Sequence, residues 1–224
     1  MADQARGSLR LKREALIESL EGRVTEHERW LLQRLMHQVE FIESEIKEFD
    51  ERIASLMQER EAQLKRLDTI EGVGRRGAEN LMAEIGFEMS QYPSAGDLSS
   101  WAGICPGNEK SANKRKTGKS PAGNKWVKRM LTQAGWAAIR VKDSYLGAQY
   151  RRLAGRRGKK RAIVAVGHSI LEAAYYILRD EVDYKDLGGD YFDKLNEVKT
   201  QRNLVKRLEK LGYQVELTAL AQAA

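Results

Sequence analysis

The sequence has 224 residues and a formal net charge of +7, with 39 Lys and Arg against 32 Asp and Glu. No run of about 18 apolar residues exists, which argues against a membrane-spanning helix, and the N-terminus lacks a signal-type apolar stretch. One cysteine and three histidines argue against a disulfide framework and against a Cys-based or His-rich metal site. With only three prolines and an aromatic share of 7%, the composition favours a mainly α-helical, intracellular protein.

The basic charge is concentrated in one section of the chain. Residues 106–161 contain 17 basic residues and only two acidic ones, Glu109 and Asp143. Residues 1–66, in contrast, contain 12 basic and 14 acidic residues. A local surplus of this size is typical of a surface that binds a polyanion.

The first predicted element is a long helix. Its apolar residues alternate in spacings of three and four, as a heptad seam does: Leu32, Leu35, Val39, Ile42, Ile46, Phe49, Ile53 and Leu56. The seam spans roughly 37 Å, whereas the amphipathic segment before it covers only residues 9–21. Pairing within the chain, as a helical hairpin, and pairing with a second copy both remain open. We favour the second copy, because the first segment is too short to cover the seam.

Residues 67–86 predict a helix end, a Gly72-Val73-Gly74 turn and a second, amphipathic helix. This order resembles a helix-hairpin-helix module. Glycines permit the tight turn, and the N–H groups of the following helix can face a phosphate. Arg75 and Arg76 stand at that helix start, where they suit contact with a DNA backbone. An ordinary αα-turn is the alternative.

A short helix capped by Asp97 is expected next, followed by a long loop at residues 104–125 with almost no apolar anchor. A loop of this length in a compact domain is usually functional or disordered. An amphipathic helix follows from about Lys125 to Val141.

The basic stretch 151–161 leads into residues 162–178, which are apolar nearly all round and predict a buried central helix. His168 lies in this run, where a hydrogen-bonded core residue is the expectation and a metal ligand the alternative. The acidic tail lacks calcium-loop spacing, so we expect a solvated turn there. Residues 197–211 predict a final amphipathic helix.

Several motifs in this order carry a family resemblance: Trp101 to Gly107, Lys110 to Lys114, Gly123 to Leu131, Gly167 to Leu171, and Asp186 to Phe192. Together with the helix-hairpin-helix segment and the coiled coil, they closely resemble the C-terminal transposase domain of DEDD-type, Piv-invertase-like insertion-sequence transposases. These are the IS-one-ten and IS-one-sixteen type, bridge-RNA-guided recombinases. The resemblance covers about residues 30–215 and implies DNA transposition and site-specific recombination.

The resemblance implies a nucleophilic serine in the loop, at the place of Ser111. The family usually has glycine after this serine, and this chain has Ala112. Ser120 is the local competitor, and a solvated loop serine is the alternative for Ser111. The chemistry needs charge stabilisation of a phosphorane-like transition state, which nearby basic residues supply. The predicted nucleic-acid-binding residues are Gly72, Gly74, Arg75, Arg76, Lys110, Lys114, Arg115, Lys116, Lys119, Lys125, Lys128, Arg129, Arg156, Arg157, Lys159, Lys160 and Arg161.

The family also has an N-terminal RuvC-like domain that binds a divalent metal such as Mg²⁺, and this sequence does not contain its pattern. We therefore expect no cofactor in this chain itself, and little or no recombination by the chain alone. The expected organisation is dimerisation helices at 1–66, a helical transposase domain at 67–195 and a C-terminal helix and tail at 196–224.

The expected partners are DNA, a second copy through the coiled coil and, by resemblance, a guide RNA; no membrane is expected. The expected location is the cytoplasm of a bacterium or archaeon, associated with the nucleoid. Two rival functions stay open. One is a non-catalytic nucleic-acid-binding and dimerising remnant, and the other is a structural basic protein of ribosomes or chromatin, which has no motif in its favour.

Overall fold

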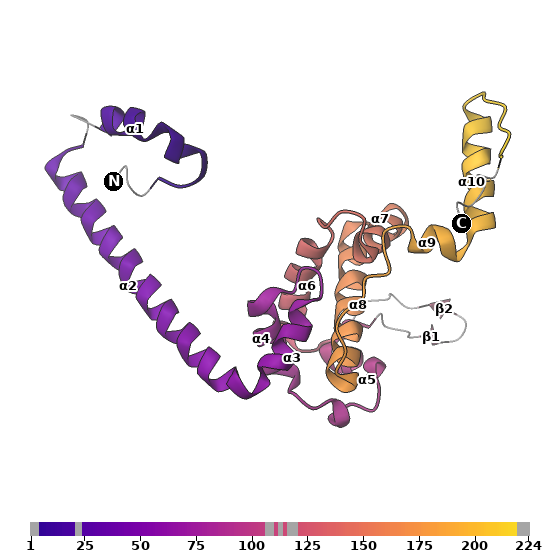
Figure 1. Cartoon of the computed structure of the whole chain (residues 1–224), viewed down its shortest axis with the longest axis horizontal. Helices are drawn as coiled ribbons and strands as arrows, with labels where there is room; N and C mark the ends of the chain where they lie inside the picture. The colour runs from indigo at the N-terminus through magenta and orange to yellow at the C-terminus, as the bar shows by residue number, and fades with distance from the viewer. Residues whose placement is uncertain (1–4, 21–23, 106–109, 112–113, 116–120, 219–224) are drawn as a thin grey trace, which may run out of the picture. The chain divides into compact units, whose positions relative to one another are not determined.

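A computed structural model of the chain describes residues 5–20, 24–105, 110–111, 114–115 and 121–218 (Figure 1). It divides into two compact units, Met1–Gln58 and Glu59–Ala224. The division falls at residue 58, whereas the sequence suggested a boundary at residue 66. Apart from one pair of two-residue strands, the regular elements of the described residues are helices. The predicted mainly α fold is therefore confirmed.

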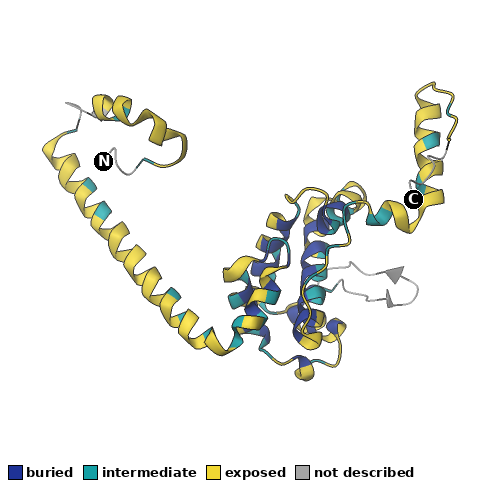
Figure 2. Ribbon diagram, viewed as in Figure 1, coloured by how far each residue is buried: buried dark blue, intermediate teal, exposed yellow. Residues whose placement is uncertain are grey.

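The first unit consists of the 3₁₀ turn η2 (Gly7–Lys12), helix α1 (Arg13–Leu20) and the long helix α2 (Glu26–Met57). Thr25 caps α2 in both directions: its Oγ1 accepts from the Glu28 N–H at 3.3 Å, and its own N–H donates to Glu28 Oε2 at 2.7 Å. No residue of α2 is buried, and Figure 2 shows it mostly exposed, with a few intermediate positions. The predicted heptad seam is thus present on a helix whose apolar side is not covered within the described part of this unit.

The second unit begins with the predicted helical hairpin. After the turn η3 (Gln58–Arg60), helix α3 (Glu61–Asp68) and helix α4 (Gly74–Ile85) pack against each other. Leu64, Leu67, Ala78 and Leu81 are fully buried between them and the rest of the unit. The order of helix, glycine turn and helix is therefore the one predicted from the sequence.

The core of the second unit is helix α8 (Lys159–Asp180), which packs against α5 (Ala95–Ala102), α6 (Lys125–Ala138) and α7 (Tyr145–Arg157). By length and composition α8 is apolar enough to cross a membrane. Ten of its residues are nevertheless buried in this unit, and Figure 2 shows it at the centre of the dark-blue core. The predicted buried central helix is confirmed.

Shorter elements complete the unit. They are η4 (Met89–Gln91), the strands β1 (Lys110–Ser111) and β2 (Lys114–Arg115), α9 (Tyr191–Leu195) and α10 (Glu197–Lys210). The strands pair antiparallel, with Lys110 opposite Arg115 and Ser111 opposite Lys114.

One predicted cap is wrong. Ser94, and not Asp97, is the N-cap of α5, because its Oγ accepts from the Asp97 N–H at 3.2 Å and donates to Asp97 Oδ2 at 2.7 Å. Asp97 thus lies in the first turn, where a carboxylate also favours the helix.

Candidate functional site

The two ends of the long basic loop meet at a narrow neck, formed by residues 103–105 and 121–124. Gly103 ends α5 in the left-handed region, with φ of 69°. A Cβ on Gly103 would lie 2.8 Å from the Gly123 Cα, and one on Gly123 would collide with the Ala102 carbonyl. The two chain segments of the neck therefore touch through backbone atoms, which only glycine at both positions permits.

Two side chains hold the second segment of the neck, residues 121–124. Asn124 caps α6, because its Oδ1 accepts from the Trp126 and Val127 N–H groups at 2.8 and 3.1 Å. Its Nδ2 donates to Glu84 Oε2 on α4 at 2.6 Å. One asparagine thereby joins the loop end to the helix that follows it and to the helical hairpin.

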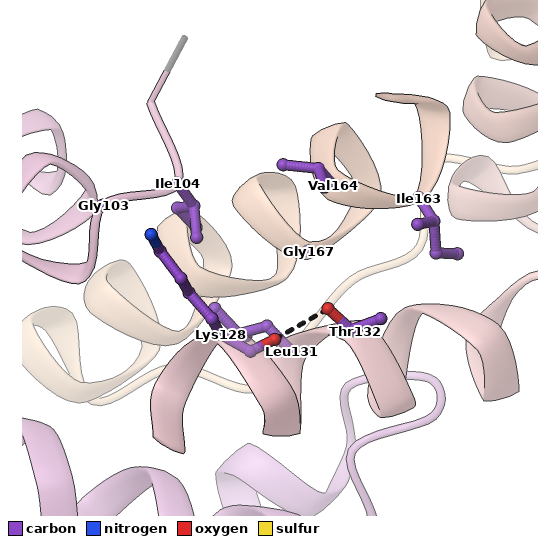
Figure 3. A pocket seen from close by; sticks show the side chains of 8 residues that line it. All are labelled: Gly103, Ile104, Lys128, Leu131, Thr132, Ile163, Val164 and Gly167. Atoms are coloured by element: carbon purple, nitrogen blue, oxygen red, sulfur yellow. Dashed lines mark hydrogen bonds between the residues drawn. The ribbon is translucent and has the colours of Figure 1, made fainter. Parts of the chain in front are cut away.

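Lys128 holds the neck from α6. Its Nζ donates to the Pro121 carbonyl at 2.7 Å, and its side chain extends toward Gly103 and Ile104 (Figure 3). Beside it lies a cavity of about 140 Å³, lined by Gly103, Ile104, Lys128, Leu131, Thr132, Ile163, Val164 and Gly167. Lys128, predicted to bind nucleic acid, thus serves the neck in this structure.

A row of hydrogen-bonded polar side chains holds the first segment of the neck, residues 103–105. Ser100 Oγ donates to Cys105 Sγ at 3.7 Å, and Cys105 Sγ lies 3.8 Å from His168 Nε2 on α8. His168 Nδ1 in turn lies 3.3 Å from Glu172 Oε2, one helical turn further on. His168 is therefore a partly buried, hydrogen-bonded residue, as expected. Among the described residues no group of three or more His, Cys, Asp and Glu side chains could hold a metal ion.

The helical hairpin meets α6 through its first glycine. Gly72 has φ of 80°, and a Cβ there would collide with the Ala134 carbonyl and the Ala138 N–H. Gly74 has φ of 63° with open space around it. The turn thus needs two left-handed residues, but only Gly72 lies in close backbone contact with α6.

Arg75 takes part in an ion-pair network on the hairpin. Its guanidinium donates to Glu61 Oε1 at 2.7 Å and to Glu79 Oε1 at 2.8 Å. The Arg75 guanidinium holds the pKa of the Glu61 carboxyl below its ordinary value. This predicted DNA-contacting arginine therefore has two carboxylate partners, which a phosphate must displace. Arg76 stands beside it in the first turn of α4.

The other predicted site residues divide into three groups. Lys116 and Lys119 lie outside the described residues, and so do the side chains of Lys110, Ser111, Lys114 and Arg115, of which the structure gives only the strand backbones. Lys125 covers the Trp126 ring, with Nζ 4.9 Å from its centroid, and Arg129 lines a hollow of about 350 Å³ between α4 and α6. The third group is exposed around Gly158, where α7 ends and α8 begins: Arg156, Arg157, Lys159, Lys160 and Arg161.

Sequence reasoning missed residues that tertiary packing brings together. Glu84 and Asn124 are 40 positions apart, and Cys105 and His168 are 63 apart, so no local pattern links them. The one available signal was the spacing of four between His168 and Glu172, which places both on one face of a helix.

A comparison with known families identifies the class of this domain. Residues 64–151 match a family described as Transposase IS116/IS110/IS902. These residues are a transposase domain of that family, which implies DNA transposition and DNA binding. The matched segment runs from α3 into α7 and includes the hairpin, both segments of the neck and the loop. No curated protein matches the chain.

Proposed function

We propose that this chain cuts and joins DNA through Ser111 in the basic loop. The observation that carries the proposal is the family match, because it encloses the loop together with the neck that holds its ends. In the proposed step the Ser111 hydroxyl attacks a phosphodiester phosphorus. A bond forms between Ser111 Oγ and phosphorus, the bond to one deoxyribose oxygen breaks, and the proton lost by the Ser111 hydroxyl is balanced by the proton that the leaving oxygen takes up.

The basic residues of the loop support this chemistry. Negative charge grows on the phosphoryl oxygens in the transition state, and fixed cations stabilise it more than the ground state. Lys110 and Lys114 stand on the same strand pair as Ser111. The family resemblance adds a metal-binding RuvC-like domain, and we propose that turnover requires such a domain. A guide RNA stays a prediction of the resemblance.

A covalent-trapping experiment tests the serine. The chain is incubated with a nicked substrate that carries the ends of its own mobile element, with and without an added RuvC-like domain. We expect a covalent protein–DNA adduct with the added domain, no adduct with Ser111→Ala, and a normal adduct with the control Ser120→Ala. Equal adduct in wild type and Ser111→Ala would contradict the nucleophile. Unchanged DNA binding without any adduct would favour the non-catalytic alternative.

We also propose that α2 pairs with α2 of a second copy. The seam is half exposed, at 49% for Leu35, 46% for Val39 and 49% for Ile46. A sustained a/d stripe of this kind is stable in water when a partner helix covers it. The described contacts of α1 are mainly with η2, which leaves the seam available.

A further inference from the structure

A groove lies where helix α7 meets the C-terminal segment formed by α9 and α10. Its volume is about 360 Å³. Two arginines of α7, Arg152 and Arg156, face two basic residues of α10, Lys199 and Arg207, across it. Among the described residues that line it, the only acid is Asp193. The groove thus gathers four positive charges from segments about 50 positions apart in the sequence.

Among the residues that the structure describes, no carboxylate neutralises these four cations. In the part of the chain that the structure describes, no ion pair joins any of them to a carboxylate. All four residues are exposed, and the Arg152 guanidinium is placed over the Phe192 ring, 5.2 Å from its centroid. Like charges that share a groove repel one another, so the arrangement gains stability when an anion enters.

The other groups of the groove suit phosphate oxygens. Asn196 and Asn203 offer amide N–H donors and Thr200 a hydroxyl, beside the planar donors of the arginines. Arginine and short polar side chains are the usual contacts of a nucleic-acid backbone. Arg156 also begins the exposed basic run that continues from Arg157 to Arg161. A long polyanion can occupy the groove and follow that run, which a small anion cannot.

We propose that this groove binds the phosphodiester backbone of DNA as a second contact, separate from the basic loop. The inference rests on the proposed function only in that DNA is the partner. It assigns Lys199 and Arg207, which lie outside the basic section that the sequence indicated, and it adds Arg152 to the predicted nucleic-acid-binding residues. Because the contact is with the backbone, it adds affinity for DNA of any sequence and orients the duplex relative to the loop.

A matched pair of variants on one helix tests the groove. Lys199→Ala/Arg207→Ala removes two groove cations, and Arg202→Ala/Lys206→Ala removes two cations of α10 that do not line the groove. Both variants lose the same charge, and α10 has no buried residues, so neither should affect folding. Circular dichroism checks this. Affinity for a duplex of random sequence is measured by fluorescence anisotropy over a range of salt concentrations.

We expect the groove variant to bind on the order of tenfold more weakly and to lose about 1.8 units of the slope of log affinity against log salt, because each phosphate contact contributes about 0.9. The control should differ little from wild type. Equal losses in both variants would mean that only overall charge matters and would overturn the proposal, as would a groove variant that binds DNA normally. If only polyglutamate binding depends on Lys199 and Arg207, the groove is a peptide site and the proposal is also wrong. The covalent adduct at Ser111 is scored separately, so either proposal can fail alone.

Discussion

The two glycines of the hairpin, Gly72 and Gly74, allow a prediction with an internal control. Both have positive φ, at 80° and 63°, so alanine at either position introduces similar backbone strain. Only Gly72 contacts α6: a Cβ there would come within 3.0 Å of backbone atoms of Ala134 and Ala138. Neither backbone atom can turn aside as a flexible side chain would.

The expected loss of stability follows from the backbone strain and from the close contact with α6. Alanine in the left-handed region costs about 1–2 kcal/mol of stability, which is the expected loss for Gly74→Ala. In Gly72→Ala the hairpin must also move away from α6, and overpacking of this kind costs about 1–3 kcal/mol more. We therefore expect Gly72→Ala to lose about 2–5 kcal/mol in all. For a chain of this size each kcal/mol lowers Tm by roughly 2–4 °C.

Urea unfolding measures the difference directly. Trp101, Trp126 and Trp136 all lie in the second unit, so their fluorescence follows that unit, with Trp30 of α2 replaced by phenylalanine in every protein. The free energy of unfolding should fall further for Gly72→Ala than for Gly74→Ala, with similar slopes against urea. Equal losses would refute the argument, because they would mean that α6 does not approach Gly72 as closely as the structure places it.

Three further predictions use the same unfolding assay or a measurement of mass. Asn124→Ala should lower the free energy of unfolding by about 1–3 kcal/mol, since it removes a helix cap and the bond to Glu84. Asn124→Asp keeps the cap but places a carboxylate against the Glu84 carboxylate, so this variant should be less stable at neutral than at acidic pH. Equal stability at both pH values would contradict this. Burial and the charge of Asp186 raise the pKa of Glu71, so the native state binds this proton more tightly than the unfolded state and stability falls as pH rises through the raised pKa. Glu71→Gln should therefore gain stability over wild type at neutral pH but not at acidic pH, and the same difference at both would argue against the shift. In light scattering, Ile42→Glu/Ile46→Glu should convert a dimer to a monomer. The control Ser44→Glu/Ser55→Glu, which lies outside the seam, should stay a dimer. If both variants are monomers, or both are dimers, the result would argue against pairing through α2.

Periodic features of the fold could be predicted from the sequence. The heptad spacing identified α2, and the apolar run before Arg179 identified α8, because burial on one side or all round leaves a repeating pattern. The glycine pair identified the hairpin for a similar reason, since a tight turn restricts residue type locally. Ser94 was missed as a cap because Asp97, three residues later, is an equally good capping residue by type.

The site was less predictable, because its contacts join distant parts of the chain. The sequence indicates that Arg75 is basic and stands at a helix start, but not that Glu61 and Glu79 surround it. The charge surplus of residues 106–161 can be read from the sequence. Lys199 and Arg207 lie beyond this section, and only the folded arrangement of α7, α9 and α10 brings them to the groove that Arg152 also lines. Which cations act together thus depends on packing and not on local composition.

The neck explains how the two ends of a loop with almost no apolar residues are held in the unit. Bringing the ends of a flexible loop together costs entropy that grows only slowly with its length, so the closure can be stabilised entirely at the ends. Here the contact of Gly103 with Gly123, the Lys128 bond to Pro121 and the Asn124 bond to Glu84 do this. The residues between are then free to be selected for charge and chemistry. Since Glu84 on α4 and Lys128 on α6 hold the neck from outside the loop, a substitution of either should affect the action of Ser111 without changing a residue of the loop itself.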